Sequence, residues 1–266
     1  NELTSNSLVR KISFTGSTPV GKWLMQQSGQ TLKKLSLELG GNAPFIVFDD
    51  ADLDAAVAGA MISKYRNAGQ TCVCANRIYV QRTVYQAFVT KLTQAVNALK
   101  VGNGLENGVV VGPLIDQKAF DKVDRLVKDA VAKGATIVTG GKKHALGGTF
   151  YEPTILSNAT KPMDLTQEEI FGPVAPIYRF ETEAEVIQKA NDTPFGLAAY
   201  FYGQNIGRIF RVAEALEYGM VGINTGLIST ATAPFGGVKE SGFGREGSKY
   251  GMDDYLEMKY MCFGGI

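Results

Sequence analysis

The segment Asn67-Ala68-Gly69-Gln70-Thr71-Cys72-Val73-Cys74 places two cysteines two residues apart, after a glycine and among small or uncharged neighbours. The Ala-rich run over 53–66 predicts a helix before it, and the run over 77–81 predicts a strand after it. A thiol on a turn between two elements can be exposed and can act as a nucleophile. A cysteine is also often just a small buried apolar residue, so the segment alone leaves both interpretations open.

Apolar periodicity extends this helix–turn–strand pattern over the whole chain. Strands are predicted at 11–14, 35–39, 44–48, 77–80, 137–139, 198–202 and 221–224, and helices at 20–28, 53–66, 85–99, 117–133, 183–191 and 206–216. Such alternation predicts an α/β fold with a largely parallel sheet flanked by helices. The chain from Ile155 predicts an irregular arm. The run over 255–263 predicts a terminal edge strand that can pair with another chain.

Composition excludes several classes of function. The chain has 266 residues, and 45% of them are hydrophobic, which is enough for a sizeable core. The formal net charge is only +1, so we expect neither nucleic acid nor an anionic membrane as a partner. We also expect no membrane-spanning segment and no secretory leader.

The numbers of cysteines and histidines further limit the possible compartment and the possible metal sites. Three cysteines without framework spacing favour a reducing, cytoplasmic setting. The only histidine, His144, lies in a Gly- and Lys-rich loop that predicts an exposed hairpin, so a multi-His metal site is excluded. The Cys-x-Cys spacing has no second pair and is not a zinc motif, so no metal is predicted.

Three further segments carry residue types suited to a site. Glu38 ends a predicted strand before Gly40-Gly41, where an acid can face a cleft. The run Phe14-Thr15-Gly16-Ser17-Thr18-Pro19 joins a strand to a helix that Thr18 can cap, which leaves backbone N–H groups free for an anion. Glu168-Glu169-Ile170-Phe171-Gly172-Pro173 places two acids before an aromatic residue. Each is also typical of ordinary structure: a solvated acid, a capped helix and a loop.

The cysteine segment and the segment around Glu38 carry a family resemblance. Gly69-Gln70-Thr71-Cys72 and Leu37-Glu38-Leu39-Gly40-Gly41 resemble the active-site segments of the aldehyde dehydrogenase superfamily, and the longer string around Cys72 is similar to its succinate-semialdehyde dehydrogenases. The resemblance implies that Cys72 is the nucleophile, which forms a thioester with the substrate. It implies that Glu38 is the general base, which activates water to release the acid.

The resemblance also implies a nicotinamide cofactor, NADP or NAD. The family's phosphate-side segment corresponds to Gly16 and Ser17. Its nicotinamide-side contacts correspond to Leu39, Glu169 and Phe171, of which the glutamate binds the ribose hydroxyls and the phenylalanine packs by the nicotinamide. A carboxylate suits that task because it can accept hydrogen bonds from both hydroxyls.

Substrate and redox assignments follow. The resemblance places Arg66 and Ser229 beside the distal acid of the substrate, most simply succinate semialdehyde, where a guanidinium can form a charge-assisted fork. A surface arginine is the plain alternative. Cys74, separated from Cys72 by one residue on a turn, is predicted to form a strained, reversible disulfide with it.

The resemblance runs from Lys11 onward and corresponds to roughly the second half of a family member. It implies a remnant of the cofactor-binding domain at 1–40, a catalytic domain at 41–252 and a C-terminal oligomerisation strand at 253–266. The expected partners are a small aldehyde and further copies of the chain, as a homo-oligomer. The oxyanion-hole asparagine and the residues that choose between NAD and NADP would lie in the other half, so the chain alone is expected to be inactive.

Other functions stay open at this stage. The chain could be a non-catalytic module that dimerises through its terminal strand, or an aldehyde dehydrogenase for a different aldehyde. A cofactor-free cysteine hydrolase is less favoured, because no histidine is placed to pair with Cys72.

Overall fold

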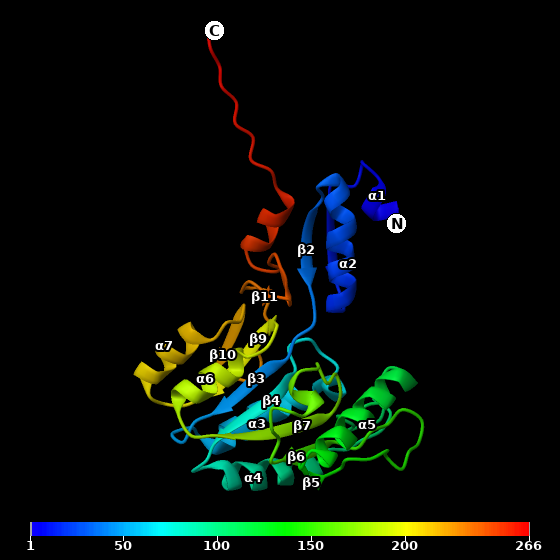
Figure 1. Ribbon diagram of the computed structural model, residues 1–266, viewed down its shortest axis with the longest axis vertical. Coiled ribbons are helices and arrows are strands. Elements are labelled where there is room, and N and C mark those ends of the chain that lie inside the picture. Colours follow the sequence, from blue (N-terminus) through cyan, green and yellow to red (C-terminus); the bar gives the residue numbers. More distant parts are fainter. Residues whose placement is uncertain (1, 266) are drawn as a thin grey trace.

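The structure, a computed structural model, describes residues 2–265 and is built around a seven-stranded sheet (Figure 1). Its spatial order is β10 (Met220–Ile223), β9 (Ala198–Tyr202), β3 (Ala43–Val47), β4 (Ala75–Gln81), β7 (Val174–Phe180), β6 (Thr154–Ser157) and β5 (Thr136–Thr139). Every neighbouring pair is parallel except β5–β6. The predicted α/β class with a largely parallel sheet is confirmed.

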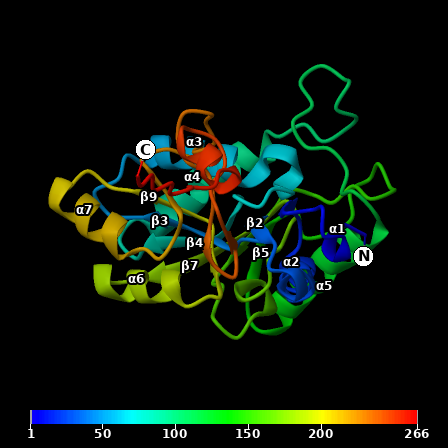
Figure 2. The ribbon, with the colours of Figure 1, turned by 90° about the horizontal axis from the view of Figure 1, so that it is seen from above.

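Helices cover both faces of this sheet (Figure 2). One face packs against α3 (Leu53–Tyr65) and α4 (Tyr85–Asn97), and the other packs against α5 (Gln117–Ala132), α6 (Glu183–Asn191) and α7 (Ile206–Ala215). Alternate residues of β3 divide between the two layers, Phe45 and Val47 to the first and Ile46 to the second. A strand buried on both faces reads as a continuous apolar run, as 43–47 does.

A second, smaller sheet lies above the first in Figure 1. It pairs β1 (Lys11–Thr15) with β2 (Lys34–Glu38) in parallel, and β12 (Gly242–Phe243) joins β2 in the antiparallel sense. The short α1 (Glu2–Ser5), α2 (Thr18–Ser28) and the 3-10 turn η1 (Gly29–Thr31) accompany it.

The chain's C-terminal part returns to complete this small unit. Ser36 donates to Asp254 at 3.0 Å, and Lys34 forms an ion pair with Glu257 at 2.8 Å. Residues predicted as two separate segments, 1–40 and 253–266, are therefore in contact. The domain division itself stays a prediction.

Three local predictions differ from the structure. The irregular arm from Ile155 was wrong, because residues 154–157 and 174–180 form β6 and β7, inside the sheet. Their burial comes from layers on both sides, so neither shows an alternating pattern. The N-cap of α2 is Ser17, whereas Thr18 is the first helical residue and is buried, and its hydroxyl donates to the Glu240 carbonyl.

The third difference is the terminal strand. Residues 250–255 form the 3-10 helix η4 (Tyr250–Tyr255), and residues 256–265 run away from the body without regular structure (Figure 1). A strand needs a neighbouring backbone to bond with, and the described single chain offers none there. Met258, Tyr260 and Phe263 are largely exposed on this segment. Its role in oligomerisation stays a prediction.

The remaining elements are short. The strands β8 (Phe195–Gly196) and β11 (Val238–Lys239) pair with each other, and the 3-10 turns η2 (Arg66–Gly69) and η3 (Asp164–Thr166) lie in connections. None of the helices within residues 2–265 is long and apolar enough to cross a membrane.

Candidate active site

Three of the predicted site segments meet where the small sheet ends and the large sheet begins. Glu38 is the last residue of β2, Cys72 lies three residues before β4, and Glu169 lies shortly before β7. Because β3, β4 and β7 are neighbours in the sheet, the segments that enter them are neighbours too. The Gly41 N–H, just before β3, donates to Glu169 Oε1 at 3.0 Å. A Cβ on Gly41 would lie 2.3 Å from the Cys72 carbonyl oxygen, so only glycine fits this approach.

Cys72 lies on a tight turn, as predicted, in which the Cys74 N–H donates to the Thr71 carbonyl at 3.1 Å. Asn67 and Ala68 before it have φ of 52° and 55°, a conformation that costs free energy in residues other than glycine. A Cβ on Gly69 would lie 2.2 Å from the Gly172 carbonyl oxygen. The backbone of the cysteine turn, residues 67–74, is therefore packed directly against the backbone of the loop that carries Glu169 and Phe171.

The thiol of Cys72 is partly exposed and strongly prefers its protonated form. Burial raises its pKa to about 11, and the negative charges of Glu169 and Glu38 add to the effect. The backbone N–H groups of Cys72 and Val73 act in the opposite direction by hydrogen bonding to the sulfur. A reaction at this sulfur at neutral pH therefore needs a group that removes the proton.

Glu38 is a titratable residue close enough for its charge to raise the pKa of Cys72. Its side chain is 4% exposed, and within the described chain its Oε2 atom is buried without a hydrogen-bond partner. Burial raises the pKa of Glu38 to about 8, the charge of Glu246 raises it further, and the charge of Arg245 opposes them. A carboxylate that exchanges its proton near neutral pH is suited to general base catalysis.

Sequence reasoning missed Arg245, Glu246 and Lys122. The first two lie in the Gly-rich region after Pro234. This region packs on the rest of the chain, because the Ser241 hydroxyl donates to the Gly40 carbonyl at 2.7 Å. Lys122 lies on α5, where burial lowers its pKa and the charge of Glu169 opposes that effect. No motif marks these positions in the sequence.

Glu169 and Phe171 lie on the loop before β7. Burial raises the pKa of Glu169, while the Gly41 N–H and the charges of Lys122 and Lys64 oppose the effect. Phe171 has a φ of 53°, so its backbone adopts the left-handed conformation at this site.

The other predicted cofactor residues gather around the end of β1. The Gly16 N–H donates to the Glu38 carbonyl at 3.0 Å, which places the turn after β1 directly beside the base. Ser17 is exposed at the N-terminus of α2 and its side chain makes no capping hydrogen bond. The side chain of Leu39 is buried against Gly21 of α2.

Arg66 and Ser229 lie on segments that are far apart in the sequence. Arg66 follows α3, is exposed, and has no acidic partner within residues 2–265. Ser229 is exposed on the loop after β10, beside a cavity of about 390 Å³ that Leu227 and Ile228 help to line. This loop packs on α3, since a Cβ on Gly226 would lie 2.1 Å from the Gly59 carbonyl oxygen.

Cys74 faces away from solvent and is 1% exposed. Its sulfur accepts a hydrogen bond from Lys64 Nζ at 3.4 Å, and no disulfide joins it to Cys72, since both are free thiols. The predicted reversible disulfide therefore requires Cys74 to leave this contact, and it stays a prediction.

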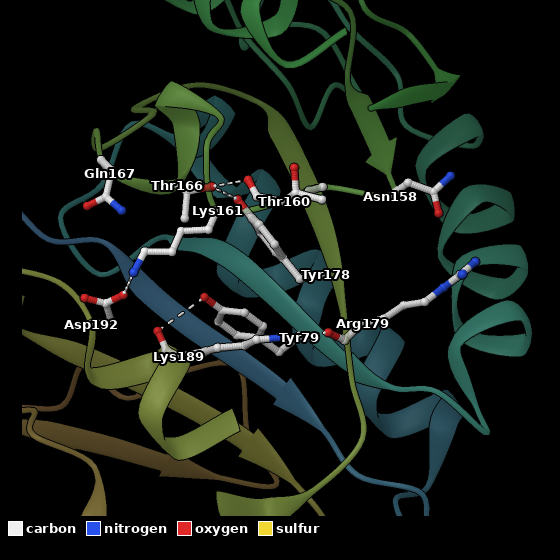
Figure 3. Close-up of a pocket in the computed structure, with 11 residues that line it drawn as sticks. Tyr79, Asn158, Thr160, Lys161, Thr166, Gln167, Tyr178, Arg179, Lys189 and Asp192 are labelled. Carbon is white, nitrogen blue, oxygen red and sulfur yellow. Dashed lines mark hydrogen bonds and ion pairs between the residues drawn. The ribbon is translucent and has the colours of Figure 1, made fainter. Parts of the chain in front are cut away.

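Figure 3 shows a cavity of about 400 Å³ elsewhere in the molecule, between β4, β7 and α6. Four of its polar groups pair with one another: Thr166 and Tyr178 share a hydrogen bond of 2.8 Å, and Lys161 pairs with Asp192. It contains none of the predicted site residues, so its size does not make it the active site. No group of three or more potential metal ligands occurs within residues 2–265.

The aldehyde dehydrogenase family model matches residues 1–261, nearly the whole chain. The chain belongs to the aldehyde dehydrogenase family. The family resemblance inferred from the segments around Cys72 and Glu38 is thereby confirmed, and the α/β body and the junction described above are those of an aldehyde dehydrogenase chain.

Individual relatives are similar over the whole chain. It is 68% identical to a glutarate-semialdehyde dehydrogenase of Pseudomonas aeruginosa, with 100% of this chain and 55% of the relative covered. It is 65% identical to the succinate-semialdehyde dehydrogenase [NADP(+)] of Escherichia coli, with 99% and 55% covered. The crystal structure of a succinate-semialdehyde dehydrogenase from Burkholderia pseudomallei superposes with a TM-score of 0.98 at 64% identity, with 98% and 54% covered. The aldehyde dehydrogenase chain described here thus spans about half the length of these relatives.

Proposed function

We propose that this chain supplies the catalytic residues of an aldehyde dehydrogenase that oxidises succinate semialdehyde to succinate with NADP or NAD. The observation that carries the proposal is the arrangement of side chains where the small sheet ends and the large sheet begins. It brings a partly exposed thiol, Cys72, next to the segment that leaves Glu38, a buried carboxyl whose pKa is about 8. A nucleophile and a base with these properties are what acyl chemistry on an aldehyde requires.

The residues take the following roles. The Cys72 sulfur, once deprotonated, adds to the aldehyde carbon, and the Cys72 N–H donates to the oxygen that becomes negative. Glu38 then removes a proton from the water that hydrolyses the Cys72 thioester to the acid. The burial that raises the pKa of Glu38 also makes it a stronger base than an exposed glutamate.

The residues present fit a nicotinamide dinucleotide, which when bound supplies the acceptor for the hydride of the aldehyde. The exposed N-terminus of α2 at Ser17, directly after the Gly16 turn, offers backbone N–H groups to a phosphate. Glu169 keeps its Oε2 atom towards Gly40, while Oε1 is held by the Gly41 N–H, so one oxygen remains to accept a ribose hydroxyl. Phe171 and Leu39 would hold the nicotinamide side.

Arg66 and Ser229 support a substrate with a second acid group. Arg66 has a guanidinium without an acidic partner in the described chain, and it can form a charge-assisted bond to a distal carboxylate. The names of the two relatives above point in the same direction, since succinate and glutarate semialdehydes both carry such a carboxylate. Glutarate semialdehyde is therefore the second candidate, and it is favoured by the 68% identical relative.

We further propose that the working enzyme is a cytoplasmic homo-oligomer. The free state of Cys72, Cys74 and Cys262 fits a reducing compartment. The exposed apolar residues of 256–265 fit a segment that pairs with another copy.

Addition of the thiol to the aldehyde needs no cofactor, so it can be tested on the 266-residue chain itself. We expect succinate semialdehyde to slow alkylation of Cys72 by iodoacetamide at pH 8.5, measured by peptide mass spectrometry. Cys262, which is exposed, serves as the internal control and should react at the same rate with and without aldehyde.

One variant and one further substrate sharpen the result. Arg66→Ala should weaken protection by succinate semialdehyde but not by butanal, which lacks the distal acid. Glutarate semialdehyde at equal concentration ranks the two candidate substrates. Equal alkylation of Cys72 with and without every aldehyde would refute the nucleophile assignment and would favour the non-catalytic module.

A further inference from the structure

Lys64 and Cys74 form a buried pair beneath the cysteine turn. Lys64, in the last turn of α3, is 0% exposed, and Cys74 is 1% exposed. The Lys64 Nζ atom lies 3.4 Å from the Cys74 sulfur and 3.0 Å from Asn76 Oδ1, and these are its hydrogen-bond partners within residues 2–265. Neither partner is a carboxylate, which is unusual for a fully buried lysine.

The environment favours an uncharged amine. Removing an ammonium from water without an acidic partner is unfavourable, and a lysine avoids that penalty by losing its proton. Burial lowers the pKa of Lys64, while Cys74 and the charge of Glu169 act against this. An uncharged amine has a free lone pair and is a nucleophile.

We propose that Lys64 and Cys74 are a redox-sensitive pair in which peroxide oxidation joins Nζ and Sγ by a covalent sulfenamide bond. The 3.4 Å separation between rigid elements lies within the range at which two atoms are poised to react. The proposal is independent of the proposed dehydrogenase activity. It also differs from a Cys72–Cys74 disulfide, because it makes Lys64 the partner of the buried sulfur.

The steps balance. Hydrogen peroxide oxidises the Cys74 thiol to a sulfenic acid and is reduced to water. The Lys64 lone pair then attacks the sulfur, the S–O bond breaks, and the oxygen leaves with two protons as a second water. Relative to the free amine and thiol, the product has lost two hydrogens. Burial keeps soluble thiols away from the sulfenic acid, so the neighbouring amine competes well for it.

The bond would be reversible and would protect the protein. Once local opening or unfolding exposes the bond, a small thiol converts it to a mixed disulfide and the free amine, and a second thiol releases Cys74. Because sulfinic and sulfonic acids form irreversibly, capture of the sulfenic acid by Lys64 prevents permanent damage beneath the Cys72 turn.

The test uses the 266-residue chain with Cys72→Ser and Cys262→Ser, which leaves Cys74 as the only thiol. After treatment with hydrogen peroxide, the chain is alkylated, denatured and digested with trypsin without reductant. We expect a linked species that joins residues 35–66 to 67–77, lighter by two hydrogens than the sum of its peptides, because the bond blocks cleavage after Lys64. Dithiothreitol should remove it.

Matched variants identify the amine that takes part in the bond. Lys64→Met should abolish the linked species, and circular dichroism checks that it folds. Lys33→Met should retain it, because Lys33 is also buried but donates to the carbonyls of Asn6 and Val9 rather than to a sulfur. Complete cleavage after Lys64 with Cys74 recovered only as thiol, sulfinic or sulfonic acid would overturn the proposal, and so would a linked species that keeps the oxygen.

Discussion

Replacing Glu38 with glutamine should stabilise the fold while it removes the proposed base. Burial raises the pKa of Glu38 from 4.5 to about 8, so the folded chain holds a proton there that the unfolded chain releases above pH 4.5. Unfolding between these two pH values releases a proton, and stability therefore falls as pH rises through this window. Glutamine has no proton to release and should show no such loss.

The magnitude follows from the two pKa values. Each pH unit between them costs about 1.4 kcal/mol, so the full effect is about 5 kcal/mol at pH 8 and about 3 kcal/mol of it develops between pH 5 and pH 7. The figure applies to a side chain that is 4% exposed, where solvent screens little. A sacrifice of stability of this size is typical of a residue kept for catalysis.

The assay is urea unfolding of the chain at pH 5, 6, 7 and 8 for the wild type and for Glu38→Gln. The difference in unfolding free energy should grow by about 3 kcal/mol from pH 5 to pH 7 in favour of the variant. Glu214→Gln, at an exposed carboxylate on α7, is the control and should track the wild type. A difference between Glu38→Gln and the wild type that stays constant across this pH range would refute the reasoning.

Three further predictions concern turnover and substrate binding in an enzyme that contains this chain, and cofactor binding by the chain alone. Cys72→Ala should abolish dehydrogenase turnover with an unchanged melting profile, whereas Cys74→Ala should be far milder; appreciable turnover by the Cys72 variant would remove it from the nucleophile role. Arg66→Ala should raise KM for succinate semialdehyde about 30-fold, the equivalent of about 2 kcal/mol for a lost charge-assisted bond, and equal effects on butanal would make Arg66 structural. The chain by itself should bind NADP no better than about millimolar, because it offers few of the charged contacts that a dinucleotide needs; micromolar binding by isothermal titration would contradict this.

Several features could be predicted from the sequence because they depend on local pattern. The helix over 183–191 and the strand over 198–202 were predicted with the bounds that the structure has, since a capping box marks the start of the helix and a continuous apolar run marks the strand. The strand over 174–180 was not, because Pro176 lies within it and a proline argues against a strand in the interior of a sheet. The terminal strand was predicted from its composition, but a strand also needs a neighbour, and the single chain provides none at 256–265.

The candidate site also has features that the sequence predicted and features that only the tertiary structure decided. Sequence segments alone indicated Cys72, Glu38 and the family, because short runs of residues carry that information. Tertiary structure decided the acid–base properties, since the pKa of Glu38 depends on burial and on Glu246, more than two hundred residues away in the chain.

What the sequence by itself determined is the α/β class and the family, and it singled out Cys72 as the candidate nucleophile, because all of these are encoded in local runs of residues. What only the tertiary structure decided is which distant groups meet. The order β3–β4–β7 brings the segments of Gly41, Cys72 and Glu169 together, although they are spread over more than a hundred residues. The turn at 71–74 likewise returns Cys74 to Lys64. Strand order and chain reversal are set by the packing of the whole core, and no local pattern in the sequence specifies them.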